Sequence, residues 1–314
     1  MSTLYLDHKN MQLAVEGQTL VARIEDQRQR PIPLSLLERV VVSASVSLQS
    51  RVLMALAERG IVVAFISPRK ASLQAVLLGR AHNQANIRLG QYQCTQDRVW
   101  RLDFSIGLVD AKLKAGVRLL EEAAAARADC RKALLSAATS IQAIRPLLKV
   151  CEHLDQLRGF EGAAARLFFG AYRLLFAPGL GFEGRKRRPP PDPVNATLSL
   201  AYTLLHVRAV QLAYAAGLDP MLGFFHEPVH GRESLACDLV EPWRPCIERW
   251  VWEQFRAREF RAERFQSGAN GGCFLDKPGR AQFYAAFERM VKPVHRAIRL
   301  QTYTVRRLLM ETVG

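Results

Sequence analysis

The sequence LQSRVLMALAERGIVVAFI, residues 48–66, encodes a helix followed directly by a strand. Val52 and Leu56 are four residues apart, which places them on one face of a helix. Gly60 stands where helices commonly end in a left-handed residue. The run Ile61–Ile66 is continuously apolar and rich in β-branched side chains, as in a buried strand. The stretch therefore predicts a helix packed on a sheet.

The residues before this stretch read as further strands. Leu4 and Leu6 alternate with polar neighbours, and a Glu16-Gly17-Gln18 turn separates two more extended segments. Val40–Val42 is a short β-branched run. We therefore predict that residues 1–82 form a small N-terminal β-rich domain with one packed helix.

Beyond residue 82 the pattern becomes helical. Apolar residues such as Phe104 and Leu108 begin a series of long amphipathic helices that continues to the C-terminus. The interruption Glu183–Val194 contains four consecutive basic residues and three consecutive prolines, which exclude a helix. We predict an exposed, stiff, cationic loop there. The expected fold is α+β, with a larger all-α domain over residues 83–314.

The charge balance points to a polyanionic partner. Lys and Arg total 44 against 29 Asp and Glu, a net charge of +15, and the pI is near 10.0. Such an excess favours nucleic acid over a merely solvated basic face or a membrane surface. The N-terminal residues lack a signal-peptide pattern, no apolar run reaches about 20 residues, and the six cysteines form no CxxC pair. We expect a soluble, cytoplasmic protein.

An acidic pair offers candidate metal ligands. In HEPVHGRESLACDLVE, residues 226–241, Asp238 and Glu241 are three apart, so a helix would present them on one face. Paired carboxylates suit Mg²⁺ or Mn²⁺, and an added imidazole favours Mn²⁺. A pair at this spacing is more commonly a solvated helix face.

The imidazole of such a site is not fixed by spacing. His226 follows the apolar residues 223–225, which also suits an ordinary core histidine. His230, Glu227 and Glu233 could equally be ligands.

Glu161 is a further carboxylate with two interpretations. It lies in GFEGAAAR, residues 159–166, where glycines bracket Phe160-Glu161 and the small residues that follow begin a predicted helix. The pattern predicts a carboxylate at a helix N-terminus, where it could bind a metal or simply complement the helix dipole. From this fragment alone, a favourable interaction of Glu161 with the helix dipole is the preferred interpretation over metal binding.

Two basic groups could contact DNA. The first group is the four cations of the proline-rich loop: Arg185, Lys186, Arg187 and Arg188. They could contact phosphates, or they could only make the protein more soluble. Lys292, Arg296 and Arg299 share one face of the predicted C-terminal helix. They could follow a phosphate backbone or cover apolar surface with their aliphatic stems.

Together these fragments resemble the CRISPR-associated spacer-acquisition integrases. The resemblance covers nearly the whole chain and rests on Ile61–Ile66 and on four further motifs: GFEGAAAR (159–166), RPPPDPVNATLS (188–199), GFFH (223–226) and SLACDLVEPWRP (234–245). It implies that Glu161, His226 and Glu241 are metal ligands and that Asp238 is an additional acidic site residue. The departures, Ala236-Cys237 and Trp243, remove no ligand.

The resemblance also implies an activity and partners. Such a protein joins captured double-stranded DNA fragments to a CRISPR repeat array by phosphodiester transesterification, using Mg²⁺ or Mn²⁺. It forms homodimers, two of which flank a dimer of a smaller CRISPR-associated adaptation protein, and we expect residues 1–82 to supply such contacts. The alternatives are a structure-selective repair nuclease that hydrolyses branched DNA and a non-catalytic DNA-binding scaffold.

Overall fold

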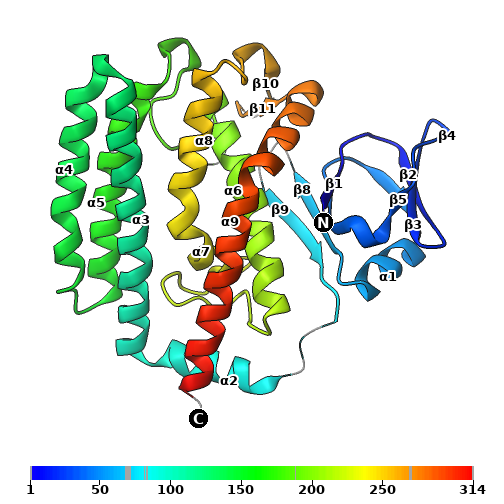
Figure 1. Ribbon diagram of the computed structural model, residues 1–314, viewed down its shortest axis with the longest axis horizontal. Coiled ribbons are helices and arrows are strands. Elements are labelled where there is room, and N and C mark those ends of the chain that lie inside the picture. The colour runs from blue at the N-terminus through cyan, green and yellow to red at the C-terminus, as the bar shows by residue number, and fades with distance from the viewer. Residues whose placement is uncertain are drawn as a thin grey trace.

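The computed structural model describes residues 2–67, 72–80, 82, 84–187, 189–268 and 271–312. Strands fill the N-terminal part and long helices follow, so the predicted α+β class is confirmed (Figure 1).

The N-terminal strands form two sheets. The first has the spatial order β1 (Ser2–Leu6), β6 (Leu37–Val42), β8 (Val62–Ser67) and β9 (Ser72–Leu77). The second has the order β4 (Gln27–Arg28), β3 (Thr19–Ile24), β2 (Met11–Glu16) and β7 (Val46–Leu48), and β5 (Ile32–Pro33) pairs with β3. The first sheet is parallel from β1 to β8 and antiparallel between β8 and β9.

The helix and strand predicted from residues 48–66 are both present. Helix α1 spans Ser50–Glu58, and Gly60 adopts a φ of 66°, the left-handed conformation that glycine accepts without strain. Strand β8 follows at Val62. Because β6 and β8 are parallel neighbours, α1 belongs to the crossover between them.

The first sheet joins the two parts of the molecule, because successive side chains of a strand point to opposite faces. Val40, Val42 and Val63 belong to the N-terminal core cluster. Val41 and Ala64 belong to the large cluster of the helical region. The predicted domain limit at residues 82 and 83 falls between β9 and α2 (Ala85–Gln96), and it stays a prediction.

Long helices build the remainder of the chain. They are α2, α3 (Arg98–Ala126), α4 (Arg131–Leu148), α5 (Leu154–Tyr172), α6 (Pro193–Ala215), α7 (Ser234–Val240), α8 (Arg244–Arg256) and α9 (Lys277–Glu311). Short 3-10 helices join them or the strands: η1 (Leu34–Leu36), η2 (Ala128–Cys130), η3 (Arg173–Leu175), η4 (Pro178–Leu180), η5 (Glu241–Trp243) and η6 (Ala262–Arg264).

Among the helices, α6 packs against α7, α8 and α9. Figure 1 shows α3, α4 and α5 side by side on the flank away from the strands, with α6, α8 and α9 between them and the first sheet. Helix α6 is buried on nearly every face, as expected for a helix that is apolar all round. None of the described helices has both the length and the apolar character needed to cross a membrane.

A β-hairpin inside the helical region corrects the prediction of an all-α domain. Strands β10 (Phe265–Ser267) and β11 (Cys273–Leu275) pair antiparallel. Cys273 and Leu275 are buried, and the Cys273 N–H donates to the Pro190 carbonyl at 2.6 Å. The hairpin thus forms against the proline-rich segment, a long-range contact that local sequence patterns do not reveal.

Candidate metal centre

Asp238 fixes the loop that carries His226. Its carboxylate is completely buried on α7 and accepts backbone N–H groups from Phe224 at 2.6 Å, Phe225 at 3.1 Å and His226 at 3.0 Å. The same carboxylate lies 2.7 Å from Nδ1 of His226. A proton on Nδ1 satisfies this contact and leaves the Nε2 lone pair free to bind a cation.

Gly223 makes this turn possible. A Cβ atom there would lie 2.7 Å from the Ser234 carbonyl carbon and 2.8 Å from Asp238 Oδ2. Only a residue without a side chain allows Asp238 to approach the turn so closely. The close approach of Asp238 therefore explains why the GFFH motif begins with glycine.

Glu241 faces the other side of the imidazole. It begins η5, directly after α7, and its Oε1 lies 3.8 Å from His226 Nε2. Lys112 Nζ contacts Oε2 at 2.7 Å, and Arg244 Nε contacts Oε1 at 2.7 Å. Burial raises the pKa of Glu241, but the Arg244 and Lys112 cations outweigh burial and hold that pKa far below its usual range. The carboxylate is therefore ionised.

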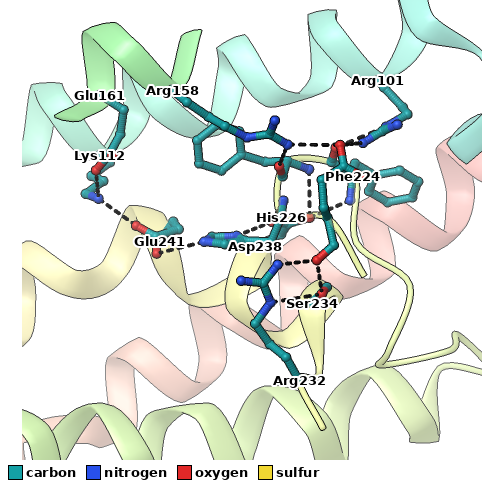
Figure 2. A network of polar contacts seen from close by, with 12 residues as sticks. Arg101, Lys112, Arg158, Glu161, Phe224, His226, Arg232, Ser234, Asp238 and Glu241 are labelled. Carbon is teal, nitrogen blue, oxygen red and sulfur yellow. Dashed lines mark hydrogen bonds and ion pairs between the residues drawn. The ribbon is translucent and has the colours of Figure 1, made fainter. Parts of the chain in front are cut away.

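Glu161 completes the group through a shared lysine. Lys112 on α3 lies 2.5 Å from Glu161 Oε1 and bridges this carboxylate to Glu241 (Figure 2). Glu161 lies in the middle of α5, so its predicted place at a helix N-terminus is wrong. The glycines at 159 and 162 are interior to α5, which packs against α3 and α4. Tertiary packing outweighs their low helix propensity.

These side chains fit a divalent cation in kind. Two carboxylates and one imidazole nitrogen converge from α5, η5 and the loop before α7, and an ammonium already lies between the carboxylates. As the side chains stand, no three His, Cys, Asp or Glu residues in the described ranges are close enough to hold a metal. Lys112 occupies the space between the carboxylates.

The alternative ligands lie elsewhere. Glu227 pairs with Arg101 at 2.8 Å and Arg158 at 3.0 Å, and Glu233 pairs with His206 at 3.0 Å. His230 is exposed. The structure thus brings Glu161, Glu241 and His226 together and leaves the other candidates in different contacts.

Lys112 and Arg244 are the neighbours that sequence reasoning did not single out. Arg244 stood in the SLACDLVEPWRP motif but had no assigned role. Lys112 shares a helical stripe with the buried residues Val109, Gly116 and Leu119. A lysine within an apolar stripe was the available signal, because a buried ammonium requires carboxylate partners.

The predicted basic loop is only partly exposed to solvent. Arg185 donates to Asn195 and Ser199, each at 2.9 Å, and its guanidinium lies over the Tyr202 ring. Burial is the main cause that lowers the pKa of Arg185 to about 10. The expectation of a fully exposed loop is therefore wrong at Arg185, which is fastened to α6. Lys186 and Arg187 are exposed, and Arg188 lies outside the described residues.

Two cationic surfaces remain available. Lys292, Arg296 and Arg299 are exposed and follow one another along one face of α9. A cavity of about 410 Å³ is lined in part by Arg185, Arg187, Arg232 and Arg244. Since Arg244 also contacts Glu241, this cavity adjoins the candidate metal centre.

Known proteins share this sequence and architecture. Residues 4–289 match the family model described as CRISPR associated protein Cas1. The chain is 37% identical over 299 residues to CRISPR-associated endonuclease Cas1 1 of Thermodesulfovibrio yellowstonii, covering 93% of this chain and 92% of that protein.

Solved structures show the same fold. A Cas1 protein from Thermotoga maritima aligns over 99% of this chain and 97% of its own, with a TM-score of 0.86 and 22% identity. A casposase bound to integration product aligns over 99% and 91%, with a TM-score of 0.84 and 19% identity. The chain also covers 35% of a chain from a Cas6-RT-Cas1–Cas2 complex, with 99% of this chain aligned, a TM-score of 0.84 and 19% identity. The matched family model and the full-length relative together show that this chain belongs to the CRISPR-associated Cas1 family.

Proposed function

We propose that this chain is a divalent-metal-dependent DNA endonuclease and integrase that inserts captured DNA fragments into a CRISPR array. The observation that carries the proposal is the convergence of Glu161, Glu241 and His226, with Asp238 orienting the imidazole. The endonuclease name of the Thermodesulfovibrio yellowstonii relative and the fold shared with a casposase on its integration product support it.

The three proposed ligands and Asp238 would have separate roles. Glu161 and Glu241 would supply carboxylate oxygens, and His226 would supply Nε2. When bound, Mg²⁺ or Mn²⁺ supplies charge neutralisation at the scissile phosphate and lowers the pKa of the attacking hydroxyl. Asp238 holds the imidazole ring from its buried side, so that Nε2 faces Glu241.

The reaction proposed is a transesterification. The 3′-hydroxyl of the fragment attacks a phosphodiester of the repeat, one P–O bond forms, and another 3′-oxygen leaves with a proton. With water as the attacking group, the same site would cleave DNA. No side chain needs to act as a nucleophile, which agrees with a site built of carboxylates, an imidazole and cations.

Exposed cations would hold the DNA backbone. Lys186 and Arg187, together with the α9 face formed by Lys292, Arg296 and Arg299, can contact phosphates without reading bases. Arg185 faces the same cavity as Arg187, and its donors already serve Asn195 and Ser199. We assign it chiefly to shaping that cavity.

The partners proposed are DNA, a second copy of the chain and a Cas2 protein. The match to a Cas1-containing chain of a Cas6-RT-Cas1–Cas2 complex supports the Cas2 assignment. The homodimer, and the cytoplasm as the place of action, stay predictions.

A strand-joining assay tests the proposal. The protein, with its Cas2 partner, is given a fragment with free 3′-hydroxyls and a supercoiled plasmid bearing the repeat. Covalent joining is expected with Mn²⁺ or Mg²⁺ and should be lost in Glu161→Gln and His226→Ala. Glu152→Gln and His153→Ala, at exposed positions just before α5, are the matched controls. Cutting without joining would favour the repair nuclease, and DNA binding with neither cutting nor joining would favour a non-catalytic scaffold. Full joining by both site variants would overturn the proposed metal site.

A further inference from the structure

Lys112 holds the position between two of the proposed metal ligands. Its ammonium contacts Glu161 Oε1 at 2.5 Å and Glu241 Oε2 at 2.7 Å, and its side chain is about four-fifths buried, with 20% exposed. A single ammonium thus pairs with two carboxylates that belong to helices far apart in the sequence. The same two oxygens would face a divalent cation.

We propose that Lys112 is a displaceable counterion, which holds Glu161 and Glu241 together until a divalent cation takes its place. This inference rests on the proposed metal-dependent function. It explains why three ligands converge and yet do not stand at metal-binding distances from one another.

The two cations at Glu241 differ in how firmly they are held. Arg244 contacts Oε1 and also lies over the Tyr202 ring, 4.7 Å from its centroid. Lys112 contacts Oε2 through a flexible four-carbon chain, whereas a planar guanidinium stacked on an aromatic ring is held in one orientation. Arg244 is therefore expected to stay and Lys112 to move.

The structure contains space for that movement. A cavity of about 40 Å³ is lined by Lys112, Glu161, Phe168 and Glu248 among others. An ammonium is about the size of a water molecule, and a cavity of roughly 10–15 Å³ admits one water. Glu248 is buried and offers a carboxylate on the wall of this cavity. The ammonium can therefore withdraw toward Glu248, whose pKa burial raises and whose carboxylate accepts a hydrogen bond from the Tyr202 hydroxyl.

Two effects follow from this arrangement. Without metal, Lys112 should stabilise the fold, because removing it leaves two partly buried carboxylates to repel each other. With metal, Lys112 should oppose binding, since its positive charge must move away from the ligands. Replacing Lys112 by a neutral residue should therefore lower the thermal stability of the protein without metal and increase its affinity for divalent cations.

The test measures binding and unfolding, independently of activity. Free Mn²⁺ is counted by its electron paramagnetic resonance signal while the full-length protein is titrated with MnCl₂, and thermal unfolding is followed with and without Mn²⁺. The variants are Lys112→Met and the more conservative Lys112→Gln, which keeps the protein folded if methionine does not. Lys114→Met, an exposed lysine two residues along α3, is the matched control, and Glu161→Gln reports the metal site itself.

The expected result is a fall in the Mn²⁺ dissociation constant of about tenfold or more in the Lys112 variants and no change in Lys114→Met. Their lower melting temperature without metal should return to that of the wild type at saturating Mn²⁺. Unchanged or weaker Mn²⁺ binding by Lys112→Met and Lys112→Gln, with normal binding by the wild type, overturns the counterion role alone. Failure of the wild type to bind Mn²⁺ any better than Glu161→Gln overturns the proposed metal site and the counterion role with it.

Discussion

Oδ1 of Asp238 lies 2.7 Å from Nδ1 of His226, on a carboxylate that has no exposure to solvent. The same carboxylate accepts three successive backbone N–H groups, from Phe224 to His226. One buried residue therefore fixes both the loop and the orientation of the imidazole.

Asp238→Asn should impair the fold and the metal centre together. An amide presents an NH₂ group to donors that require an acceptor, which leaves buried N–H groups without partners at a cost of about 1–3 kcal/mol each. Loss of the oriented imidazole should lower metal affinity or joining rate by about 10- to 100-fold. Urea unfolding and Mn²⁺ titration check the two effects, and wild-type values in both would contradict the role given to Asp238.

Gly223→Ala should disturb the same loop for a steric reason. The added methyl would lie 2.7 Å from the Ser234 carbonyl carbon, so the backbone must shift, at a cost of about 1–3 kcal/mol. Gly170→Ala is the control, since nothing lies within 4 Å of its Cβ position in α5. Alanine should stabilise that helix by about 0.5–1 kcal/mol. Equal melting temperatures for the two variants would contradict the close approach at Gly223.

The His206–Glu233 pair should make stability depend on pH. Burial lowers the pKa of His206, but Cys237 and Glu233 outweigh burial and raise it to about 9, above the ordinary value of about 6.5. The contribution of this pair to the free energy of unfolding is therefore fully present below about pH 6.5 and is lost as the pH rises through about 9. Its size is on the order of 3 kcal/mol.

Urea unfolding at pH 6 and pH 9.5 measures this contribution. The wild type should lose more stability between the two pH values than His206→Gln. His153→Gln, at an exposed position, should behave like the wild type. The same loss in His206→Gln as in the wild type would exclude the pair as the cause.

Neighbouring cations of the basic loop should give different phenotypes. Arg185→Ala should lower the melting temperature, because its guanidinium serves Asn195, Ser199 and the Tyr202 ring. Arg187→Ala should leave stability unchanged and reduce the slope of DNA affinity against salt by about 0.9 for one phosphate contact. Fluorescence anisotropy over a salt series checks the second effect. Identical behaviour of the two variants would refute the distinction.

Local patterns predicted the elements whose contacts are also local. Residues 48–66 formed the expected helix, turn and strand because apolar spacing and one left-handed glycine determine them within a few residues. The β10–β11 hairpin was missed because Pro190, some 80 residues earlier, accepts its hydrogen bond. Glu161 was misplaced because glycines at 159 and 162 imitate a helix boundary, whereas packing against α3 and α4 carries α5 through them.

The site was predictable only as a set of residue types. Its members were found through motifs, but spacing could not choose His226 over His230. The family resemblance favours His226, and in the structure Asp238 contacts the His226 ring whereas His230 is exposed. The apolar stripe on α3 marks Lys112 as a cation that needs acidic partners, but local patterns cannot identify those partners, since they are 49 and 129 residues away.

We propose that Glu161, Glu241 and His226 bind one divalent cation. Anomalous diffraction at the manganese edge, from crystals grown with MnCl₂, locates that cation. We expect one anomalous peak about 2.0–2.2 Å from a carboxylate oxygen of each glutamate and from His226 Nε2, with the Lys112 ammonium withdrawn. A peak bound to other residues, or no peak with Lys112 still between the two glutamates, would contradict it.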